Sequence, residues 1–297
     1  MRFYGSVLFL LIIMFASSCT VVGFDTPYNK GVNAYRSKKY AQATEHFKLA
    51  IADKKNFFEA WYNLALTYEK LGKPDKAENC YLKALEIQPE NARVLINFGM
   101  FLYEKGSSSR AYVFLLKATE ADDDRAYPLV ALGYYYQLEK QPEEALEMYN
   151  KACKIEPDYA LTYYRLGFFY EEKNEIEKAK DFYRQAVKFD PEDSMAAERY
   201  AWMLVKLGLV ANAISAFEKV IELEDDYLPA YIELAKLYQS SNLHEEAIII
   251  LWEARTIEPD EKEIARLLIK SYNALVKKEI LDANNTNLSE NTSPKNE

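Results

Sequence analysis

Small and large apolar residues return along the chain at a fixed interval of 34 residues. Steps of 34 that start from Ala43 meet alanine at all seven positions, namely 43, 77, 111, 145, 179, 213 and 247. Twelve residues before each alanine stands a glycine or an alanine, and four residues after it stands a large apolar residue. A small residue lets two helices approach, and a large one fills the space beside it. The pattern predicts one helical hairpin per period, whose first and second helices we call helix A and helix B.

Glycine and proline occur at fixed places in this period. Gly72, Gly106 and Gly208 share one position, where glycine would end helix A. Four prolines share another position, where proline would end helix B and open the next period: Pro89, Pro157, Pro191 and Pro259. The register then gives seven repeats without insertion or deletion, at residues 24–57, 58–91, 92–125, 126–159, 160–193, 194–227 and 228–261.

Residues 262–282 follow the last repeat and have apolar residues at helical spacings, at Ile264, Leu268, Tyr272, Leu275 and Ile280. A repeat array needs a terminal element that covers its last apolar face. We therefore predict a capping helix over 262–282 whose apolar residues cover the last repeat. Residues 283–297 are polar and without apolar periodicity, which predicts a disordered tail.

Repeat 2 carries nine residues of a known signature: Trp61, Leu64, Ala65, Tyr68, Gly72, Ala77, Tyr81, Ala84 and Pro89. This order of W-x2-L-G-x2-Y, A-x3-F-x2-A and a final proline resembles the tetratricopeptide repeat family. The resemblance implies an all-α fold, a right-handed α-solenoid superhelix of seven helical hairpins with the capping helix at its end. It also implies a non-catalytic scaffold for protein–protein interactions.

Residues 1–18 have the pattern of a secretory signal peptide. One basic residue precedes an apolar run from Val7 to Ala16, which is far shorter than the roughly 20 residues of a membrane-spanning helix. The Ala-Ser-Ser-Cys sequence that ends at Cys19 resembles the lipobox of bacterial lipoproteins. The resemblance implies a lipidated N-terminus at Cys19, followed by a short linker over 19–23. An ordinary signal peptide cut nearby and an uncleaved anchor remain the alternatives.

Lipidation would place the protein in a bacterial cell envelope, on the periplasmic face. The residue after Cys19 is Thr20 where aspartate would signal retention at the inner membrane in enteric bacteria. The resemblance therefore favours the outer membrane over the inner one.

The composition excludes several classes of function. The chain of 297 residues has 37 basic and 46 acidic side chains, a net charge of −9, which does not suit the phosphate backbone of a nucleic acid. Only nine residues are glycine, which argues against glycine-rich loops that cradle phosphates. We therefore expect no nucleic-acid partner and no cofactor.

Side chains that could carry catalysis or hold a metal are few and far apart. The two histidines, His46 and His244, stand five or more repeats apart and cannot share a metal. Cys80 and Cys153 stand two repeats apart, too far for a disulfide, so we expect both thiols to be free and buried. No nucleophile motif is present. The sequence predicts no catalytic residue and no metal site, and hence no enzyme.

A second series of large apolar residues follows helix A, on the face that lines the concave groove in this family. Because other residues already fill the packing positions, we expect this helix A stripe to be exposed and to bind an apolar or aromatic segment of a partner protein. The stripe comprises Tyr28, Tyr35, Tyr62, Leu66, Ile96, Met100, Tyr103, Tyr127, Tyr134, Tyr164, Phe168 and Trp202, with Val32, Val130, Leu161 and Met195 beside them. The alternatives are that curvature buries part of the stripe, or that a small apolar ligand binds there.

These observations predict a non-catalytic interaction scaffold that is tethered to a membrane through a lipid at Cys19. Its layout is similar to that of lipid-anchored repeat proteins that assemble type IV pili, outer-membrane proteins or flagellar structures, among them the pilotin-like lipoproteins of pilus assembly. The alternative function is an accessory subunit of a transporter that binds a small ligand in a closed pocket. The sequence does not specify the partner protein, and self-association is a further option.

Overall fold

The computed structural model describes the backbone of residues 26–291 and the side chains of residues 26–281. The described chain holds fifteen helices and no strand, so the protein is all-α. The signal peptide, Cys19 and the linker over 19–23 lie outside the described residues. The helices are α2 (Pro27–Arg36), α3 (Tyr40–Asp53), α4 (Phe58–Lys70), α5 (Pro74–Ile87), α6 (Ala92–Glu104), α7 (Ser108–Ala121), α8 (Ala126–Leu138), α9 (Pro142–Ile155), α10 (Ala160–Glu172), α11 (Ile176–Phe189), α12 (Ser194–Lys206), α13 (Val210–Leu223), α14 (Leu228–Ser240), α15 (His244–Ile257) and α16 (Lys262–Asn291).

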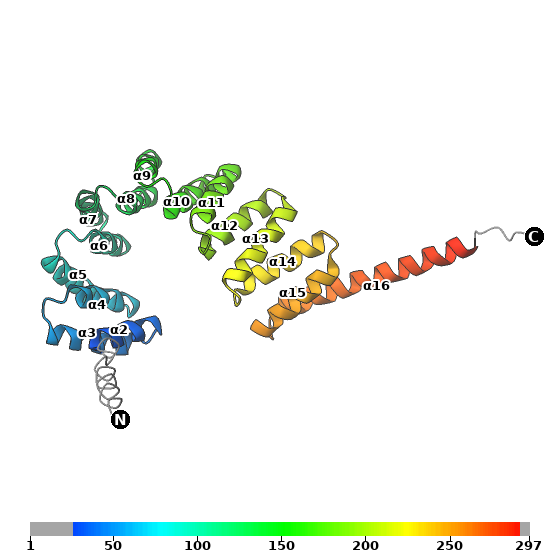
Figure 1. The fold of residues 1–297 in the computed structure, drawn as a ribbon, viewed down its shortest axis with the longest axis horizontal. Helices are drawn as coiled ribbons and strands as arrows, with labels where there is room; N and C mark the ends of the chain where they lie inside the picture. Colours follow the sequence, from blue (N-terminus) through cyan, green and yellow to red (C-terminus); the bar gives the residue numbers. More distant parts are fainter. Residues whose placement is uncertain (1–25, 292–297) are drawn as a thin grey trace, which may run out of the picture. The chain divides into compact units, whose positions relative to one another are not determined.

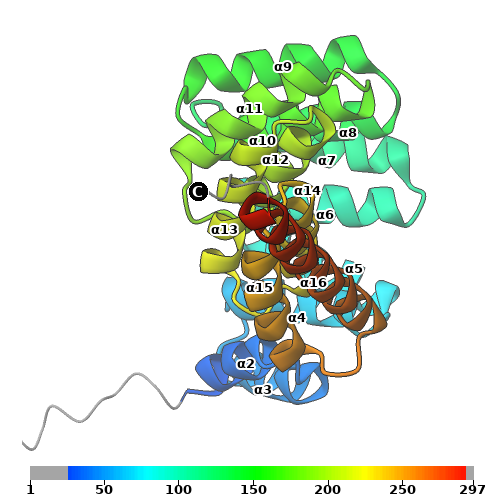
Figure 2. The ribbon, with the colours of Figure 1, turned by 90° about the vertical axis from the view of Figure 1, so that its right-hand side faces the viewer.

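The helices form two compact units that meet in sequence at residues 123 and 124. Unit 1 contains α2 to α7, which pair as the hairpins α2–α3, α4–α5 and α6–α7 (Figure 1). Unit 2 contains the hairpins α8–α9, α10–α11, α12–α13 and α14–α15, and α16 packs on α15 and α14 (Figure 2). Within each unit the second helix of one hairpin also contacts the first helix of the next, as α3 contacts α4 and α11 contacts α12.

The core of every hairpin is the small-to-large contact that the 34-residue pattern predicts. All seven marker alanines are fully buried, and the large residue four positions later is at most 1% exposed in each repeat. Helix A comes so close to helix B that a Cβ added to Gly167 would lie 2.7 Å from the ring of Tyr183. The same atom at Gly31 would lie 2.6 Å from Phe47. The small residue is thus required by the ring that packs against it.

Helix A ends in the same backbone motif in all seven hairpins. The residue two places beyond the helix has a positive φ of 58–78° at positions 38, 72, 106, 140, 174, 208 and 242. The next N–H donates to the carbonyl five residues earlier at 2.8–3.0 Å, as Gln141 does to Tyr136. This is the Schellman ending that glycine favours. The three glycines at this position confirm the predicted stop, while lysine and asparagine fill the other four positions at a conformational cost.

The last helix differs from its prediction in two ways. α16 continues to Asn291, so residues 283–291 are helical and the predicted tail over 283–297 is wrong for that stretch. No glycine or proline interrupts residues 262–291, and each residue added to an existing helix gains a hydrogen bond. Ile264 and Leu268 are buried on the last repeat as expected, but Tyr272 and Ile280 are about half exposed and do not cover it.

Among residues 26–291, no helix combines the length and the apolar character that crossing a membrane would require.

Candidate partner-binding surface

The structure places every residue of the helix A stripe on the first helix of a hairpin, from α2 to α12. All twelve predicted binding residues are half-buried, so the stripe is less exposed than expected, as in the alternative of partial burial. Beside them, Val130 is buried, whereas Leu161 and Met195 are exposed at 37% and 59%. The partial burial has a specific cause, because side chains of the following repeat reach back onto the stripe.

Two asparagines make these contacts in unit 1. Asn63 of α4 donates a hydrogen bond of 2.9 Å to the hydroxyl of Tyr28 in α2, and Asn97 of α6 donates to Tyr62 of α4. The Tyr28 ring also packs against Phe57, with ring centroids 4.8 Å apart. Burial is the main cause that raises the pKa of Tyr28 and of Tyr62 above the ordinary tyrosine value. Each asparagine therefore fixes the position of one stripe tyrosine, while burial favours the neutral form of its hydroxyl.

Buried tyrosines of helix B form a second set of contacts, which the sequence analysis did not anticipate. Tyr81, Tyr149 and Tyr183 are fully buried, and each hydroxyl donates to a side chain twelve residues earlier on helix A of the same repeat. The acceptors are Glu69, Gln137 and Glu171. Repeats with phenylalanine or leucine at this helix B position have no hydroxyl to satisfy. A tyrosine that follows Glu or Gln by twelve residues is the signal that would have revealed the pairs.

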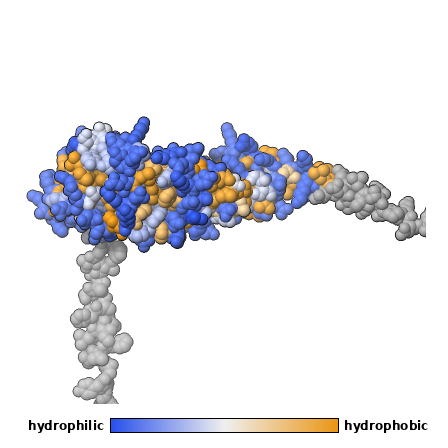
Figure 3. All heavy atoms as spheres, turned by 90° about the horizontal axis from the view of Figure 1, so that it is seen from above, coloured by the Kyte–Doolittle hydropathy of each residue, from blue (hydrophilic) through white to orange (hydrophobic). Residues whose placement is uncertain are grey.

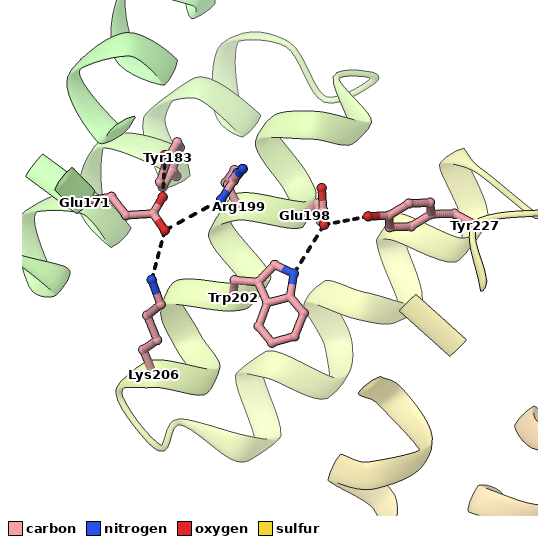
Figure 4. A network of polar contacts seen from close by, with 7 residues as sticks. All are labelled: Glu171, Tyr183, Glu198, Arg199, Trp202, Lys206 and Tyr227. Atoms are coloured by element: carbon pink, nitrogen blue, oxygen red, sulfur yellow. Dashed lines mark hydrogen bonds and ion pairs between the residues drawn. The ribbon is translucent and has the colours of Figure 1, made fainter. Parts of the chain in front are cut away.

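Glu171 is the centre of a polar network in unit 2 (Figure 4). Its carboxylate accepts the Tyr183 hydroxyl at 2.8 Å and pairs with Lys206 at 2.9 Å and Arg199 at 3.7 Å. The Glu171 side chain is only 14% exposed, so two hydrogen-bond donors and the nearby charge of Arg199 replace most of its water. Burial first, and then the bond to Glu171, raise the pKa of Tyr183 far above its ordinary value.

Glu198 is a second carboxylate in the same view (Figure 4). It accepts the Tyr227 hydroxyl at 2.7 Å and the indole N–H of Trp202 at 3.3 Å. Burial, followed by the bond to Glu198, raises the pKa of Tyr227 to about 12. Trp202 is thus fixed through its nitrogen, and its ring packs edge-on against Phe217 with centroids 5.5 Å apart.

Arginine takes the place of asparagine on this face in unit 2. Arg165 and Arg199 occupy the same position of the period as Asn63 and Asn97. The Arg165 guanidinium lies 3.9 Å from the centroid of the Tyr134 ring, which is a cation–π contact of short range. Among the described residues, Arg165 forms no ion pair with a carboxylate, in contrast to Arg199.

The charge of Arg165 stands out against its surroundings. Residues 124–297 carry 21 basic and 33 acidic side chains, a net charge of −12, whereas residues 1–123 carry 16 basic and 13 acidic ones. Arg165 is one of several basic residues of this unit without an ion pair in the described chain, and its contacts are with the rings of Tyr134 and Tyr164. The Arg165 guanidinium lies 5.9 Å from the centroid of the Tyr164 ring. Tyr164, Phe168 and Trp202 pack on one buried cluster of Ala179, Tyr183 and Met203.

The thiols do not carry chemistry. Both cysteines are free as predicted, with Cys80 buried and Cys153 only half-buried against the expectation. Burial raises the pKa of the Cys80 thiol to about 12 and also raises that of Cys153, which keeps both protonated and unreactive at neutral pH. Across residues 26–281, no three side chains of His, Cys, Asp or Glu are grouped so that they could hold a metal ion.

Two hollows lie side by side in unit 1, away from the stripe residues. Their volumes are about 420 and 310 Å³, and Ile51 and Trp61 line both of them. Lys55 and Lys83 line the larger hollow, and Lys48 and Lys76 line the smaller one. None of the twelve stripe residues lines either hollow, so neither is the predicted binding surface.

Comparison with known families agrees with this architecture. Models described as tetratricopeptide repeat match residues 58–91, 160–193 and 204–270, and a model described as TPR repeat matches residues 135–174. Together these matches cover more than half of the chain. The chain belongs to the tetratricopeptide repeat family. Proteins of this family are generally non-catalytic scaffolds for protein–protein interactions, and the repeats indicate that role here.

Curated tetratricopeptide relatives share only short stretches with this chain. Superkiller complex protein 3 of Mus musculus is 36% identical over 58 residues, which is 20% of this chain and 4% of the relative. Anaphase-promoting complex subunit 3 of Schizosaccharomyces pombe is 32% identical over 69 residues, or 23% of this chain and 10% of the relative. The chain therefore spans a small part of the length of the curated relatives it matches.

Solved tetratricopeptide structures match over most of the chain. The pilF protein of Pseudomonas aeruginosa is 18% identical with a TM-score of 0.55, covering 72% of this chain and 97% of that one. The C-terminal part of a TPR repeat-containing protein from Cytophaga hutchinsonii is 20% identical with a TM-score of 0.52, covering 81% and 99%. A chain of the APC/C hetero-tetramer Cut9–Hcn1 is 16% identical with a TM-score of 0.55, covering 88% and 52%. At such identities the likeness shows the fold alone.

Proposed function

We propose that this protein is a membrane-tethered, non-catalytic scaffold whose helix A stripe binds an apolar segment of a partner protein that also carries a carboxylate. The scaffold would serve the assembly of a bacterial envelope machine, such as a pilus, an outer-membrane complex or a flagellar structure. The membrane tether is the lipid expected at Cys19, and the envelope location rests on the signal peptide and lipobox pattern of residues 1–19.

One observation carries the binding proposal. Arg165 is stacked on Tyr134 without a carboxylate partner in the described chain, beside the half-buried rings of Tyr164 and Phe168. Half-buried aromatic rings offer a large apolar area at a low cost in side-chain entropy, because neighbouring contacts already hold them. An arginine that rests on an aromatic ring presents its N–H groups to a carboxylate. The ligand that fits is an apolar segment with one acidic group.

Unit 1 offers a different surface for the same partner or a second one. There the stripe has tyrosines that accept hydrogen bonds from asparagines, and no arginine of α4 or α6 stacks on them within the described chain. This surface suits neutral apolar segments.

Photo-crosslinking in living cells tests the proposal. A photoreactive residue replaces Tyr134 or Phe168 on the stripe, and matched controls replace Leu82 of α5 and Lys151 of α9, which are exposed on helix B. We expect the two stripe probes, and neither control, to capture one protein that mass spectrometry identifies.

Other outcomes would redirect or overturn the proposal. Capture of a small molecule from the stripe would favour the accessory subunit of a transporter, and equal capture from stripe and control probes would overturn the binding surface. A partner found without envelope localisation would contradict the tether but leave the stripe intact.

A further inference from the structure

The two C-terminal helices leave an unusually apolar surface uncovered. Six large apolar residues are 45–62% exposed there, and we call them the α15–α16 patch: Ile249, Trp252, Ile269, Tyr272, Val276 and Ile280. Scattered exposed hydrophobic residues are ordinary, but a contiguous group of this size marks an interaction surface. In Figure 3 hydrophobic surface reaches the point on α16 where the described side chains end.

The patch is continuous across the two helices. The indole N–H of Trp252 in α15 donates to the hydroxyl of Tyr272 in α16 at 3.2 Å, which places both rings on one surface. Ile249 precedes Trp252 by three residues, one turn along the same face of α15. On α16 the spacing of 269, 272, 276 and 280 aligns the apolar residues along one side of the helix. A different side of α16, with Ile264 and Leu268, packs on the last repeat.

α16 also extends well beyond its neighbours. Its 30 residues span about 45 Å, whereas the 14 residues of α15 span about 21 Å. Every side chain from Val276 to Leu281 is exposed, so this part of the helix has no partner within the described chain (Figure 1). A single helix without tertiary contacts is only marginally stable in water. The far part of α16 therefore calls for a partner.

We propose that a second copy of this chain covers the α15–α16 patch, through antiparallel pairing of the two α16 helices. If the helices cross near residues 274 and 275, Ile269 of one copy lies opposite Ile280 of the other, and Tyr272 lies opposite Val276. The projecting half of each α16 then lies along the exposed side of residues 262–273 of its partner. A twofold interface of this kind is self-complementary, because the same surface serves both copies.

The size of the patch suits such a dimer. The exposed fractions of its six residues correspond to roughly 700 Å² on each copy, close to the about 800 Å² that each partner gives to a standard interface. Lys270 and Lys277 lie on the adjoining side of α16 and are exposed. They would face each other across the dimer, so added salt should strengthen association by screening them.

Sedimentation equilibrium of residues 20–297, which include every described residue, tests the dimer. We expect the wild type to dimerise, with a tighter dimer in 0.5 M than in 0.1 M salt. Val276→Glu should weaken the dimer at least tenfold, while Val113→Glu, at a similarly exposed valine of α7, should leave it unchanged. A wild type that stays monomeric at 100 µM, or equal weakening by both variants, would overturn the proposal.

Disulfide trapping tests the direction of the pair. The Tyr272→Cys and Val276→Cys proteins are oxidised each alone and as a mixture of the two. The buried Cys80 and the half-buried Cys153 are present in every sample and give the background. Antiparallel pairing predicts links mainly between the two different variants, whereas strong links within each variant alone would contradict it. A monomer that binds anionic phospholipid vesicles through this patch, and releases them in salt, would show that a membrane covers it and would overturn the dimer.

Discussion

Lys140 has a left-handed backbone conformation, which is unfavourable for a residue that carries a side chain. It follows α8 with a φ of 59°, at the position where Gly106 and Gly208 stand in other repeats. That conformation costs an L-residue roughly 1–2 kcal/mol, and glycine avoids the cost. Glycine also makes the unfolded chain more flexible, which lowers the free energy of unfolding by roughly 0.4–1 kcal/mol. Lys140→Gly should therefore raise the free energy of unfolding by about 0.5–1 kcal/mol.

Two further variants separate the backbone effect from the loss of the lysine side chain. Lys140→Ala removes the same side chain but keeps the Cβ, so we expect no gain. Gly208→Ala should destabilise by about 0.5–1 kcal/mol, because nothing lies within 4 Å of the added methyl group and only the φ of 69° opposes it. The assay is urea denaturation followed by far-ultraviolet circular dichroism. A Lys140→Gly protein no more stable than Lys140→Ala would refute the reasoning.

Three other expectations follow from individual side chains. Tyr183→Phe should lower the free energy of unfolding by about 1–2 kcal/mol, measured by urea denaturation, because Glu171 loses a buried donor. Burial, partly offset by the Tyr81 bond, raises the pKa of Glu69, so its ionisation destabilises the fold as pH rises above the unfolded value. Glu69→Gln should therefore raise the thermal midpoint at pH 7, by a margin that disappears below about pH 4. Cys19→Ala should abolish labelling by radioactive palmitate and move the protein to the aqueous phase of a detergent partition.

The order of small, large and helix-ending residues was sufficient to predict the hairpins, because those contacts lie within one repeat. Gly167 and Tyr183 stand sixteen residues apart, on helix A and helix B of one hairpin. Their fixed places in the 34-residue period predict that they face each other. The same register places a left-handed residue at Lys38 and Asn174; asparagine adopts this conformation more readily than most residues, but lysine has no such preference. Their conformation is imposed by the hydrogen bonds that close the helix.

Contacts between repeats were not predictable in the same way. Asn63 reaches Tyr28 across 35 residues, and Arg165 reaches Tyr134 across 31, so both depend on the distance and rotation between adjacent hairpins. The pattern of one repeat does not contain that rotation. The stripe residues therefore lie on the first helices of their hairpins, as predicted, but they are less exposed than expected. The uncovered side of α16 was missed because Tyr272, with an apolar ring at helical spacing, resembles a packing residue.

The proposed function requires that the helix A stripe, and Arg165 in particular, binds the partner. The direct measurement is the amount of crosslinked partner that the Arg165→Glu and Arg184→Glu proteins capture in cells. Arg184→Glu is the matched control, because Arg184 of α11 is 58% exposed and pairs with Asp181. Circular dichroism establishes that both variants are folded. We expect at least a tenfold loss of capture for Arg165→Glu and none for Arg184→Glu. Undiminished capture by a folded Arg165→Glu protein would contradict the proposed function.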